Sequence, residues 1–347
     1  MESTKQVGEE SRAGPRIRAK LRVMTVLVTG AGGFLGSHAV AQLRARGIPV
    51  RAMVRPGHSR PWLAEQGVEV VQADLRDERG LRNACRGARA LLHCAAHKGL
   101  WSRGNREQRQ VNVEGTAALL RAAHDRGLER IVHVSTTAAV GGTREPEPLD
   151  EHASWNLHSA HVSYVTTKHE AEERALCAAW AGMPVVVVNP GALLGPRLFG
   201  PSASTLARLR SGEVRWVPPG GTSVCDVEDV ASGCLAALER GRIGERYILG
   251  GHNLSWAELY GGLARSLGVA PPRARIPTLA LGPLRFAASA LDLAGLARPP
   301  WTPEVFRTWG WYTFADSSKA IRELGYAIRP QAEMLARACT ETDAAAQ

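Results

Sequence analysis

Two side chains four residues apart, Tyr164 and Lys168, are the strongest candidates for chemistry in this sequence. They fall within residues 164–179, where the spacing of apolar residues predicts a helix, so both would lie on one helix face. A phenol can give a proton to a carbonyl oxygen if the phenolate left behind is stabilised, and a nearby ammonium group does this. A pair of this spacing is also common on surface helices, so its meaning depends on the residues that accompany it.

Hydroxyl side chains follow a predicted strand upstream of this pair. Ser135, Thr136 and Thr137 come directly after residues 130–134, a run rich in β-branched side chains. A hydroxyl at the carboxyl end of a strand could hold the carbonyl group of a substrate. Together, the pair and the hydroxyl suggest proton transfer to a ketone that receives hydride from a cofactor.

A glycine-rich turn near the beginning of the chain is where that cofactor would bind. Gly30, Gly33 and Gly36 lie between a predicted strand, residues 25–29, and a predicted helix, residues 37–46. Pyrophosphate needs backbone N–H groups pointed at it, a helix N-terminus and no side chain in the way, and glycines meet these needs. The spacing Gly-x-x-Gly-x-x-Gly at this place predicts a dinucleotide site.

The end of the second strand distinguishes the two nicotinamide cofactors. An acid there would bind the ribose 2′-hydroxyl of NAD, whereas an arginine would accept the 2′-phosphate of NADP. Residues 50–54 are followed by Arg55, and no acid occurs before Glu65. We therefore expect NADP, with NAD possible because Arg55 could equally be a solvated surface arginine. Asp74, after residues 68–72, could accept a hydrogen bond from adenine or cap the following helix.

The elements that must position these residues alternate between strand and helix. Strands are predicted at residues 25–29, 50–54, 68–72, 90–95, 130–134 and 184–189, and helices at 37–46, 75–86, 106–126 and 164–179. This alternation predicts an α/β fold, a doubly wound parallel sheet of the Rossmann type, over residues 23–195. Residues 196–340 are expected to form mainly a smaller C-terminal substrate lobe, with a possible returning strand near 246–249. Residues 1–22 are expected to be a disordered tail, and Met1 and Met24 are both possible starts.

Several motifs make the sequence resemble the extended short-chain dehydrogenase/reductase family, also called the NAD-dependent epimerase/dehydratase family. The resemblance spans about residues 24–335 and is strongest for the branch of dihydroflavonol 4-reductase-like and 3β-hydroxysteroid dehydrogenase-like proteins. The motifs that carry it are Thr29–Gly36, Val111–Thr116, Tyr164–Lys168, Asn189–Gly191, Asp226–Ala231 and Gly244–Gly250.

The resemblance implies a role for individual residues. Tyr164 would be the acid/base, Lys168 its partner and Thr136, five residues before Gly141, the hydroxyl that fixes the carbonyl, with Ser135 as the alternative. Asn112 would distort the helix that follows the fourth strand. The resemblance also implies a homodimer built from helices 106–126 and 164–179. With Arg55, Tyr164 and Lys168, the expected cofactor contacts are Gly30, Gly33, Phe34, Leu35, Gly36, Asp74, Leu75, Lys98 and Pro190.

Composition and charge argue against several other classes of protein. The net charge of +10 is spread along the chain without a basic block among aromatics, so no nucleic-acid partner is expected. No Cys-x-x-Cys pair occurs, and His152, His158, His161 and His169 lack the spacing of metal ligands, so no metal is expected. The cysteines suggest a reducing cytoplasm, with Cys94, Cys177 and Cys225 buried. No membrane span is expected, because the apolar stretch 278–297 is interrupted by Gly282, Pro283, Arg285 and Asp292; a buried or cleft-lining helix is expected there.

These observations predict an NAD(P)H-dependent reductase or dehydrogenase that interconverts a ketone and a secondary alcohol. The substrate would be a mainly apolar small molecule, such as a secondary metabolite or a steroid-like ketone, because the lobe is rich in apolar residues and tryptophans, most of which are expected in its core. An NAD-dependent sugar-nucleotide epimerase or dehydratase is the alternative. Arg55 argues against it, as does Val140, which stands where the family often has tyrosine. A non-catalytic dinucleotide sensor is less favoured, because such proteins tend to lose the tyrosine or the lysine.

Overall fold

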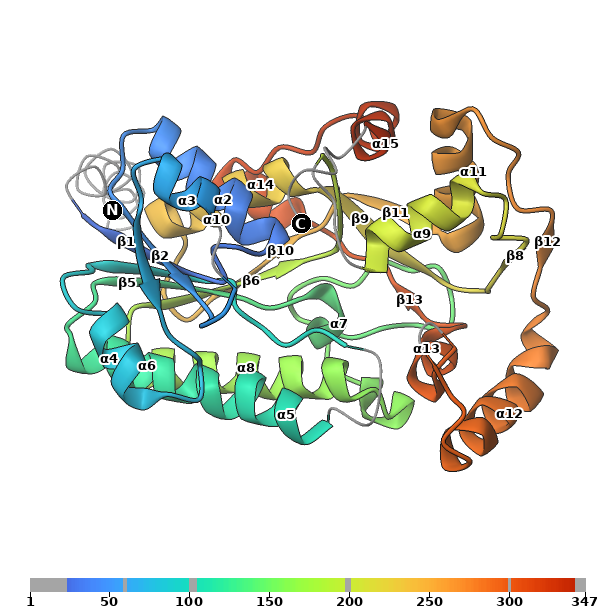
Figure 1. Ribbon diagram of the computed structural model, residues 1–347, viewed down its shortest axis with the longest axis horizontal. Coiled ribbons are helices and arrows are strands. Elements are labelled where there is room, and N and C mark those ends of the chain that lie inside the picture. The colour runs from blue at the N-terminus through green and yellow to red at the C-terminus, as the bar shows by residue number, and fades with distance from the viewer. Residues whose placement is uncertain (1–23, 59–60, 100–104, 197–200, 299–300, 341–347) are drawn as a thin grey trace, which may run out of the picture.

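A seven-stranded parallel sheet forms the centre of the protein. The computed structural model describes residues 24–58, 61–99, 105–196, 201–298 and 301–340 (Figure 1), so the predicted tail 1–22 lies outside the described residues. The strand order is β10-β6-β5-β4-β1-β2-β3, and every neighbouring pair is parallel. The strands are β1 (Val26–Thr29), β2 (Val50–Val54), β3 (Glu69–Gln72), β4 (Ala90–His93), β5 (Arg130–Val134), β6 (Val185–Pro190) and β10 (Arg246–Leu249). The predicted Rossmann-type sheet is confirmed.

Helices cover both faces of this sheet, which explains why its central strands are buried almost throughout rather than on alternate residues (Figure 1). One face packs against α2 (Phe34–Ala45), α10 (Val227–Arg240) and α14 (Ser318–Leu324). The other face packs against α4 (Glu78–Ala84), α6 (Gly115–Asp125) and α8 (Ser163–Trp180). A short helix, α3 (Pro61–Glu65), leads into the edge strand β3.

Two helices differ in detail from the sequence-based prediction. The helix expected from residue 75 begins at Glu78, because the carboxylate of Asp77 accepts the backbone N–H of Arg79 and caps it. Asp74 therefore does not cap this helix. The long helix expected at 106–126 is α5 (Asn105–Arg109), a π-helical turn η2 (Gln110–Glu114) and then α6, so the distortion expected at Asn112 is present.

A second, smaller sheet forms the core of the C-terminal lobe. Its strands are β7 (Ala192–Leu194), β9 (Gly221–Asp226), β11 (His252–Ser255) and β13 (Tyr312–Thr313), and a separate pair joins β8 (Trp216–Val217) to β12 (Ala274–Arg275). The helices α9 (Pro201–Arg210), α11 (Trp256–Leu267) and α15 (Gln331–Cys339) pack around them. The chain does not stay in this lobe after residue 195, because β10 pairs with β6 and α10 packs beside α2 on the large sheet.

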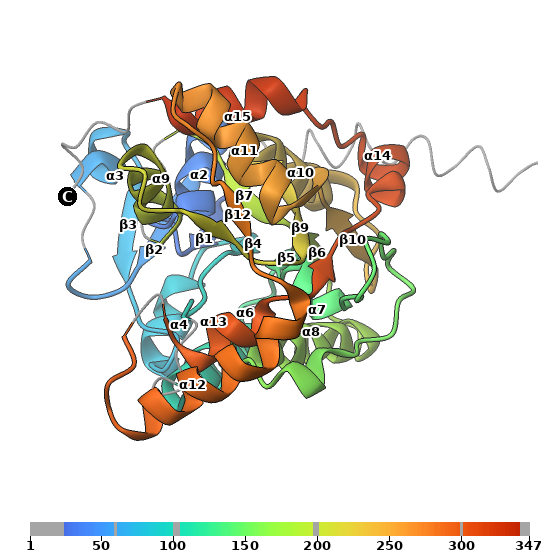
Figure 2. The ribbon, with the colours of Figure 1, turned by 90° about the vertical axis from the view of Figure 1, so that its right-hand side faces the viewer.

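A helical corner stands at the outer edge of the lobe, formed by η4 (Thr278–Ala280), α12 (Leu281–Leu293) and α13 (Pro303–Thr308) (Figure 2). The expectation that residues 278–297 form a buried helix is wrong, because α12 packs on α13 with one side and turns its other side to solvent, whereas a cleft-lining role stays a prediction.

The expected burial of Cys177 and of the lobe tryptophans is not observed. Cys177 is exposed, because it falls on the solvent side of α8, although Cys225 is buried and Cys94 half-buried as free thiols. Trp216 and Trp301 are exposed rather than part of the lobe core, and the other tryptophans predicted there are half-buried.

Candidate active site

The glycine turn lies in the crevice between β1 and β4, where the strand order of the large sheet reverses. Gly30 adopts a left-handed backbone with φ of 64°, and a Cβ atom there would lie 2.9 Å from the backbone of Ala95, just after β4. A Cβ atom on Gly36 would lie 2.1 Å from the carbonyl oxygen of Gly30. Only glycine permits these approaches, and they bring backbone to the place where a dinucleotide binds in such folds.

The N-terminus of α2 opens onto this crevice without a competing side chain. Gly33 occupies the N-cap position, no side chain caps the helix, and its first turn contains no acidic residue. The N-terminus of α2 therefore presents the positive end of the helix dipole without a side-chain cap or a carboxylate to oppose an anion. The turn fits the pyrophosphate of a dinucleotide, with Phe34 and Leu35 forming the first helical residues and Gly36 packed on the turn.

The edge where β2 and β3 end carries two arginines. Arg55 is exposed and its guanidinium contacts the ring of His58. Arg76, which the sequence argument missed, binds the carboxylate of Asp74 with two hydrogen bonds of 2.8 Å and holds the pKa of Asp74 below its usual range. The adenine-accepting role expected of Asp74 would therefore have to compete with Arg76. The arginine two residues after Asp74 in the sequence could have indicated this ion pair.

Lys98, Leu75 and Pro190 complete the expected cofactor contacts. Lys98 follows β4 and its side chain is exposed as a whole. Burial of its ammonium group nevertheless lowers the pKa of Lys98. Its charge also lowers the pKa of Lys168, which places the two lysines near one another. Leu75 is buried directly after Asp74, and Pro190 is buried as the last residue of β6.

Tyr164 and Lys168 lie on the first two turns of α8, which packs against the large sheet. Lys168 is buried, and its ammonium donates a hydrogen bond of 2.6 Å to the carbonyl oxygen of Val134, the last residue of β5. Burial lowers the pKa of Lys168 to about 8, an effect that the negative charge of Glu172 opposes. Tyr164 is half-buried and packs against the buried cluster of Leu157, Ala160, Val162 and Val165.

The titration of Tyr164 differs from the expectation. From the sequence, the Lys168 ammonium is expected to lower the pKa of the Tyr164 phenol below its ordinary value of about 10. Burial instead raises the pKa of Tyr164 to about 12, and the Lys168 ammonium is directed at the Val134 carbonyl. The phenol is therefore fully protonated at neutral pH, as a proton donor must be.

The two candidate hydroxyls at the end of β5 are not equivalent. Thr136 is half-buried at the N-cap position of the one-turn helix α7 (Thr137–Val140), and its side chain does not cap that helix. Ser135 is buried, and its hydroxyl has no hydrogen-bond partner among the described residues. Solvent access therefore favours Thr136 over Ser135 as the group that a substrate could reach.

Asn112 ties the loop after β4 to the catalytic helix. Its side-chain oxygen accepts the N–H of His97 at 2.7 Å, and its amide donates to the His97 carbonyl and to the hydroxyl of Thr167, each at 3.1 Å. The π-helical turn aims this side chain at both segments. The link fixes the helix turn that carries Lys168 relative to the loop that carries Lys98.

The histidines are not arranged as metal ligands. His169 stacks on Trp155 with ring centroids 4.0 Å apart and contacts the Ala139 carbonyl through Nδ1 at 3.0 Å. Within the described part of the chain, no group of three or more His, Cys, Asp or Glu side chains could hold a metal ion. In the same part, no helix is both long and apolar enough to cross a membrane.

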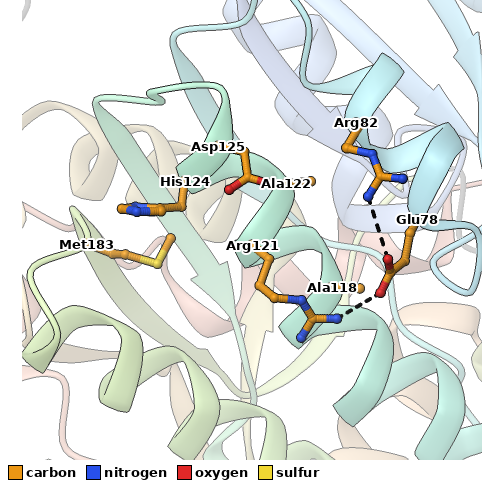
Figure 3. Close-up of a pocket in the computed structure, with 8 residues that line it drawn as sticks. All are labelled: Glu78, Arg82, Ala118, Arg121, Ala122, His124, Asp125 and Met183. Atoms are coloured by element: carbon orange, nitrogen blue, oxygen red, sulfur yellow. Dashed lines mark hydrogen bonds and ion pairs between the residues drawn. The ribbon is translucent and has the colours of Figure 1, made fainter.

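A pocket of about 200 Å³ lies on the outer side of α4 and α6 (Figure 3). Glu78 there makes ion pairs with Arg121 at 3.0 Å and Arg82 at 3.6 Å. None of the residues that line it belongs to the crevice of the glycine turn or to the catalytic turns of α8, so it is separate from the candidate site.

Comparisons with known proteins agree with this geometry. Residues 26–250 match the model of the NAD dependent epimerase/dehydratase family. A putative dihydroflavonol 4-reductase of Synechocystis is 34% identical over 86% of this chain and 88% of its own length. A second relative is 32% identical over 88% of this chain and 92% of its own length. It is the 4-hydroxy-2-methyl-3-oxo-4-farnesyl-3,4-dihydroquinoline-1-oxide ketoreductase of Stigmatella aurantiaca.

Among solved structures, a nucleoside-diphosphate-sugar epimerase from Pseudomonas aeruginosa superposes with a TM-score of 0.74 at 30% identity, over 91% of this chain and 96% of its own. Glycine turn, sheet order and family match point the same way. The chain belongs to the NAD-dependent epimerase/dehydratase family, in the branch of dihydroflavonol 4-reductase-like proteins, and is an NAD(P)-dependent oxidoreductase.

Proposed function

We propose that this protein reduces a ketone to a secondary alcohol on a mainly apolar small molecule, with Tyr164 as proton donor. The observation that carries the proposal is the protonated phenol of Tyr164 one helical turn before the buried Lys168, whose ammonium reaches the end of β5 two residues before Thr136. A bound NAD(P)H supplies hydride to the carbonyl carbon. Tyr164 gives its proton to the carbonyl oxygen as the C=O double bond becomes a single bond, and Thr136 holds that oxygen in place.

Lys168 supports this step electrostatically. Loss of the proton leaves a phenolate on Tyr164, and the ammonium one turn away would stabilise that negative charge by turning from the Val134 carbonyl toward the phenolate oxygen. Glu172, one turn further along the same helix, favours the charged form of Lys168. The cofactor would be held by the glycine turn Gly30–Gly36, by Lys98 and at Pro190.

We further propose NADP as the preferred cofactor. Arg55 presents a positive charge directly after β2, and Asp74, the acid at the end of the neighbouring strand, is already paired with Arg76. A 2′-phosphate would therefore meet a guanidinium rather than a free carboxylate.

The apolar substrate is supported by the surroundings of Tyr164, which packs against a buried apolar cluster that Trp155, Trp311 and Ala138 also contact. The relative from Stigmatella aurantiaca reduces a ketone that carries a farnesyl chain, as its name states. The similarity to a sugar-nucleotide epimerase keeps that activity as the second candidate.

The experiment that separates the two candidates is turnover of NADPH and NADH with a panel of aromatic, steroidal, terpenoid and sugar-nucleotide carbonyls. The proposal expects net oxidation of NADPH with apolar ketones, and none by a Tyr164→Phe variant. Epimerisation of a sugar nucleotide without net NAD(P)H consumption, by protein purified with NAD bound, would instead establish the second candidate.

A further inference from the structure

The side of α12 that faces solvent is almost entirely apolar. Between residues 277 and 297, the exposed residues are Pro277, Thr278, Leu279, Gly282, Pro283, Phe286, Ala287, Ala290, Leu291, Leu293, Ala294 and Leu296. The side chains of Leu279, Phe286 and Leu293 are 93%, 78% and 91% exposed. We call the surface formed by Leu279, which lies in η4 directly before the helix, and by Phe286 and Leu293 the apolar face of α12. Exposed apolar surface of this kind marks a binding surface rather than ordinary solvent contact.

The charged residues of this segment do not interrupt the apolar face. Arg285 turns inward, where its guanidinium donates to the carbonyl oxygens of Phe306 at 3.1 Å and Trp309 at 2.7 Å. Asp292 is half-buried, and Glu304 on α13 is buried. The helix is therefore amphipathic, but its charged side chains point toward the protein and its apolar side chains point toward solvent.

Arginines precede and follow this segment in the sequence. Arg273 and Arg275 are exposed before it, and Arg298, whose guanidinium donates to the carbonyl oxygens of Gly295 and Ala297, is exposed after it. Within residues 271–298, no acidic side chain is exposed. An apolar helix surface in a segment whose exposed charges are all positive complements a lipid surface that carries anionic headgroups.

The same arginines argue against a second copy of this chain as the occupant. A twofold axis would pair α12 with itself, either parallel or antiparallel. In both arrangements arginines would face arginines, with no exposed carboxylate in the segment to separate them, and like charges opposed across an interface are unfavourable.

We propose that the apolar face of α12 docks this protein on an anionic membrane surface, with the helix lying in the plane of the headgroups. The corner that carries α12 is joined to the catalytic helix: Glu304 accepts the backbone N–H of Ser163, and Arg307 donates to the His161 carbonyl at 3.1 Å. Docking would hold Tyr164 close to a surface where apolar molecules dissolve. This last consequence rests on the proposed function, whereas the docking itself does not.

The test is co-sedimentation of the full chain with vesicles of phosphatidylcholine, with and without phosphatidylglycerol. The wild type is expected to sediment with the anionic vesicles and much less with the neutral ones. A triple variant, Leu279→Ser, Phe286→Ser and Leu293→Ser, should bind at least about tenfold more weakly. The matched control, Ile243→Ser with Ile321→Ser, removes apolar residues that are 54% and 48% exposed elsewhere and should bind like the wild type.

Two further measurements keep the outcomes distinct. Thermal melting and nucleotide binding report whether the triple variant is folded, and the single variant Phe286→Ser replaces it if it is not. Equal vesicle binding by wild type, variant and control would overturn the proposal. So would light scattering that showed the triple variant alone changing from dimer to monomer, because a second copy would then be the occupant. Activity on a water-soluble ketone tests the proposed function independently and need not change in the variant.

Discussion

The carboxylate of Glu172 on α8 accepts a hydrogen bond of 2.6 Å from the side-chain amide of Asn189 on β6. The same amide donates to the backbone carbonyl of Thr136 at 3.1 Å. Glu172 is 1% exposed, and its other oxygen lies 3.4 Å from the guanidinium of Arg246 on β10. The catalytic helix is thereby connected through a buried carboxylate to the strand end that carries the proposed substrate hydroxyl.

Glu172 should therefore act as a positioning residue whose charge also matters. Burial lowers the pKa of Lys168 to about 8, so its ammonium is present below that pH and lost above it, and Glu172 works against this loss. Glu172→Gln can still accept from Asn189 but lacks the charge, so the basic limb of the kcat/KM profile should move to lower pH. Glu172→Ala should in addition lower kcat about ten- to a hundredfold. Glu173→Gln, on the exposed side of the same helix, is the control, and an unchanged pH profile in Glu172→Gln would contradict the argument.

The proposed preference for NADP can be tested at Arg55. If this arginine binds the 2′-phosphate, Arg55→Asp should weaken NADPH binding about ten- to a hundredfold, which corresponds to about 1.5–3 kcal/mol, and leave NADH nearly unaffected. Fluorescence titration of both cofactors measures this difference. Arg44→Asp, which makes the same change of charge at an exposed position of α2, should alter neither affinity. If Arg55→Asp weakened both cofactors equally, the assignment would be wrong.

Two buried histidines should make the fold sensitive to acid. His93 lies between the hydroxyls of Thr29 at 2.7 Å and Thr116 at 3.0 Å, and burial lowers its pKa to about 3. His133 is buried beside it with its pKa also lowered, and neither of its ring nitrogens has a hydrogen-bond partner among the described residues. Below the unfolded-state pKa of about 6.5, the unfolded chain binds protons that the folded chain does not. Stability should therefore fall as the pH drops from about 6.5, by up to about 1.4 kcal/mol per pH unit for each histidine.

Urea unfolding of the wild type and a His133→Leu variant at several pH values measures this effect. The variant removes one of the two proton sites and an unpartnered polar ring, so it should be at least as stable at neutral pH and lose stability less steeply in acid. Parallel curves for the two proteins would sink the explanation.

The expected homodimer would use the outer surfaces of α5, η2, α6 and α8. Trp180, at the end of α8, is 75% exposed, and burial of such a side chain is typical of an interface. Light scattering at micromolar concentration should find a dimer, and Trp180→Glu should shift it toward the monomer, whereas Ile243→Glu should not. A wild-type monomer would rule this interface out.

Local chemistry explains which parts of the fold and site could be predicted. The glycine turn is visible in the sequence because Gly30 and Gly36 each stand where a Cβ atom would strike backbone. The central strands are visible because both of their faces are buried. The contact of Glu172 with Asn189 could not be predicted, since it depends on how a helix and a strand pack in space. The membership of α10 in the large sheet's helical layer and the exposed side of α12 likewise depend on partners distant in the chain.

The most direct test of the proposed chemistry is Tyr164→Phe. Phenylalanine keeps the ring that packs against the buried cluster of Leu157, Ala160, Val162 and Val165 and deletes only the proposed proton donor. Ketone reduction should fall by about 10²–10⁴-fold, the usual contribution of a positioned acid, while the melting temperature and NADPH affinity stay close to wild type. Tyr260→Phe, which removes a phenol hydroxyl on α11 of the lobe, should leave turnover unchanged.

Substitutions of Thr136 and Lys168 should have different effects, because Thr136 is proposed to contact the substrate and Lys168 the phenol and the cofactor. Thr136→Ala should cost less than Tyr164→Phe, since water or a neighbouring hydroxyl can partly replace it. Lys168→Met should lower both turnover and cofactor affinity, because the family resemblance gives the lysine a second role at the nicotinamide ribose. Burial raises the pKa of Tyr164 to about 12, so the phenol should stay protonated across the neutral and mildly basic pH range. The basic limb of the wild-type pH–rate profile should therefore follow the loss of the Lys168 ammonium near pH 8. If Tyr164→Phe retained activity within a few-fold of wild type on a ketone that the wild type reduces, the proton would have to come from another group and the mechanism would be wrong.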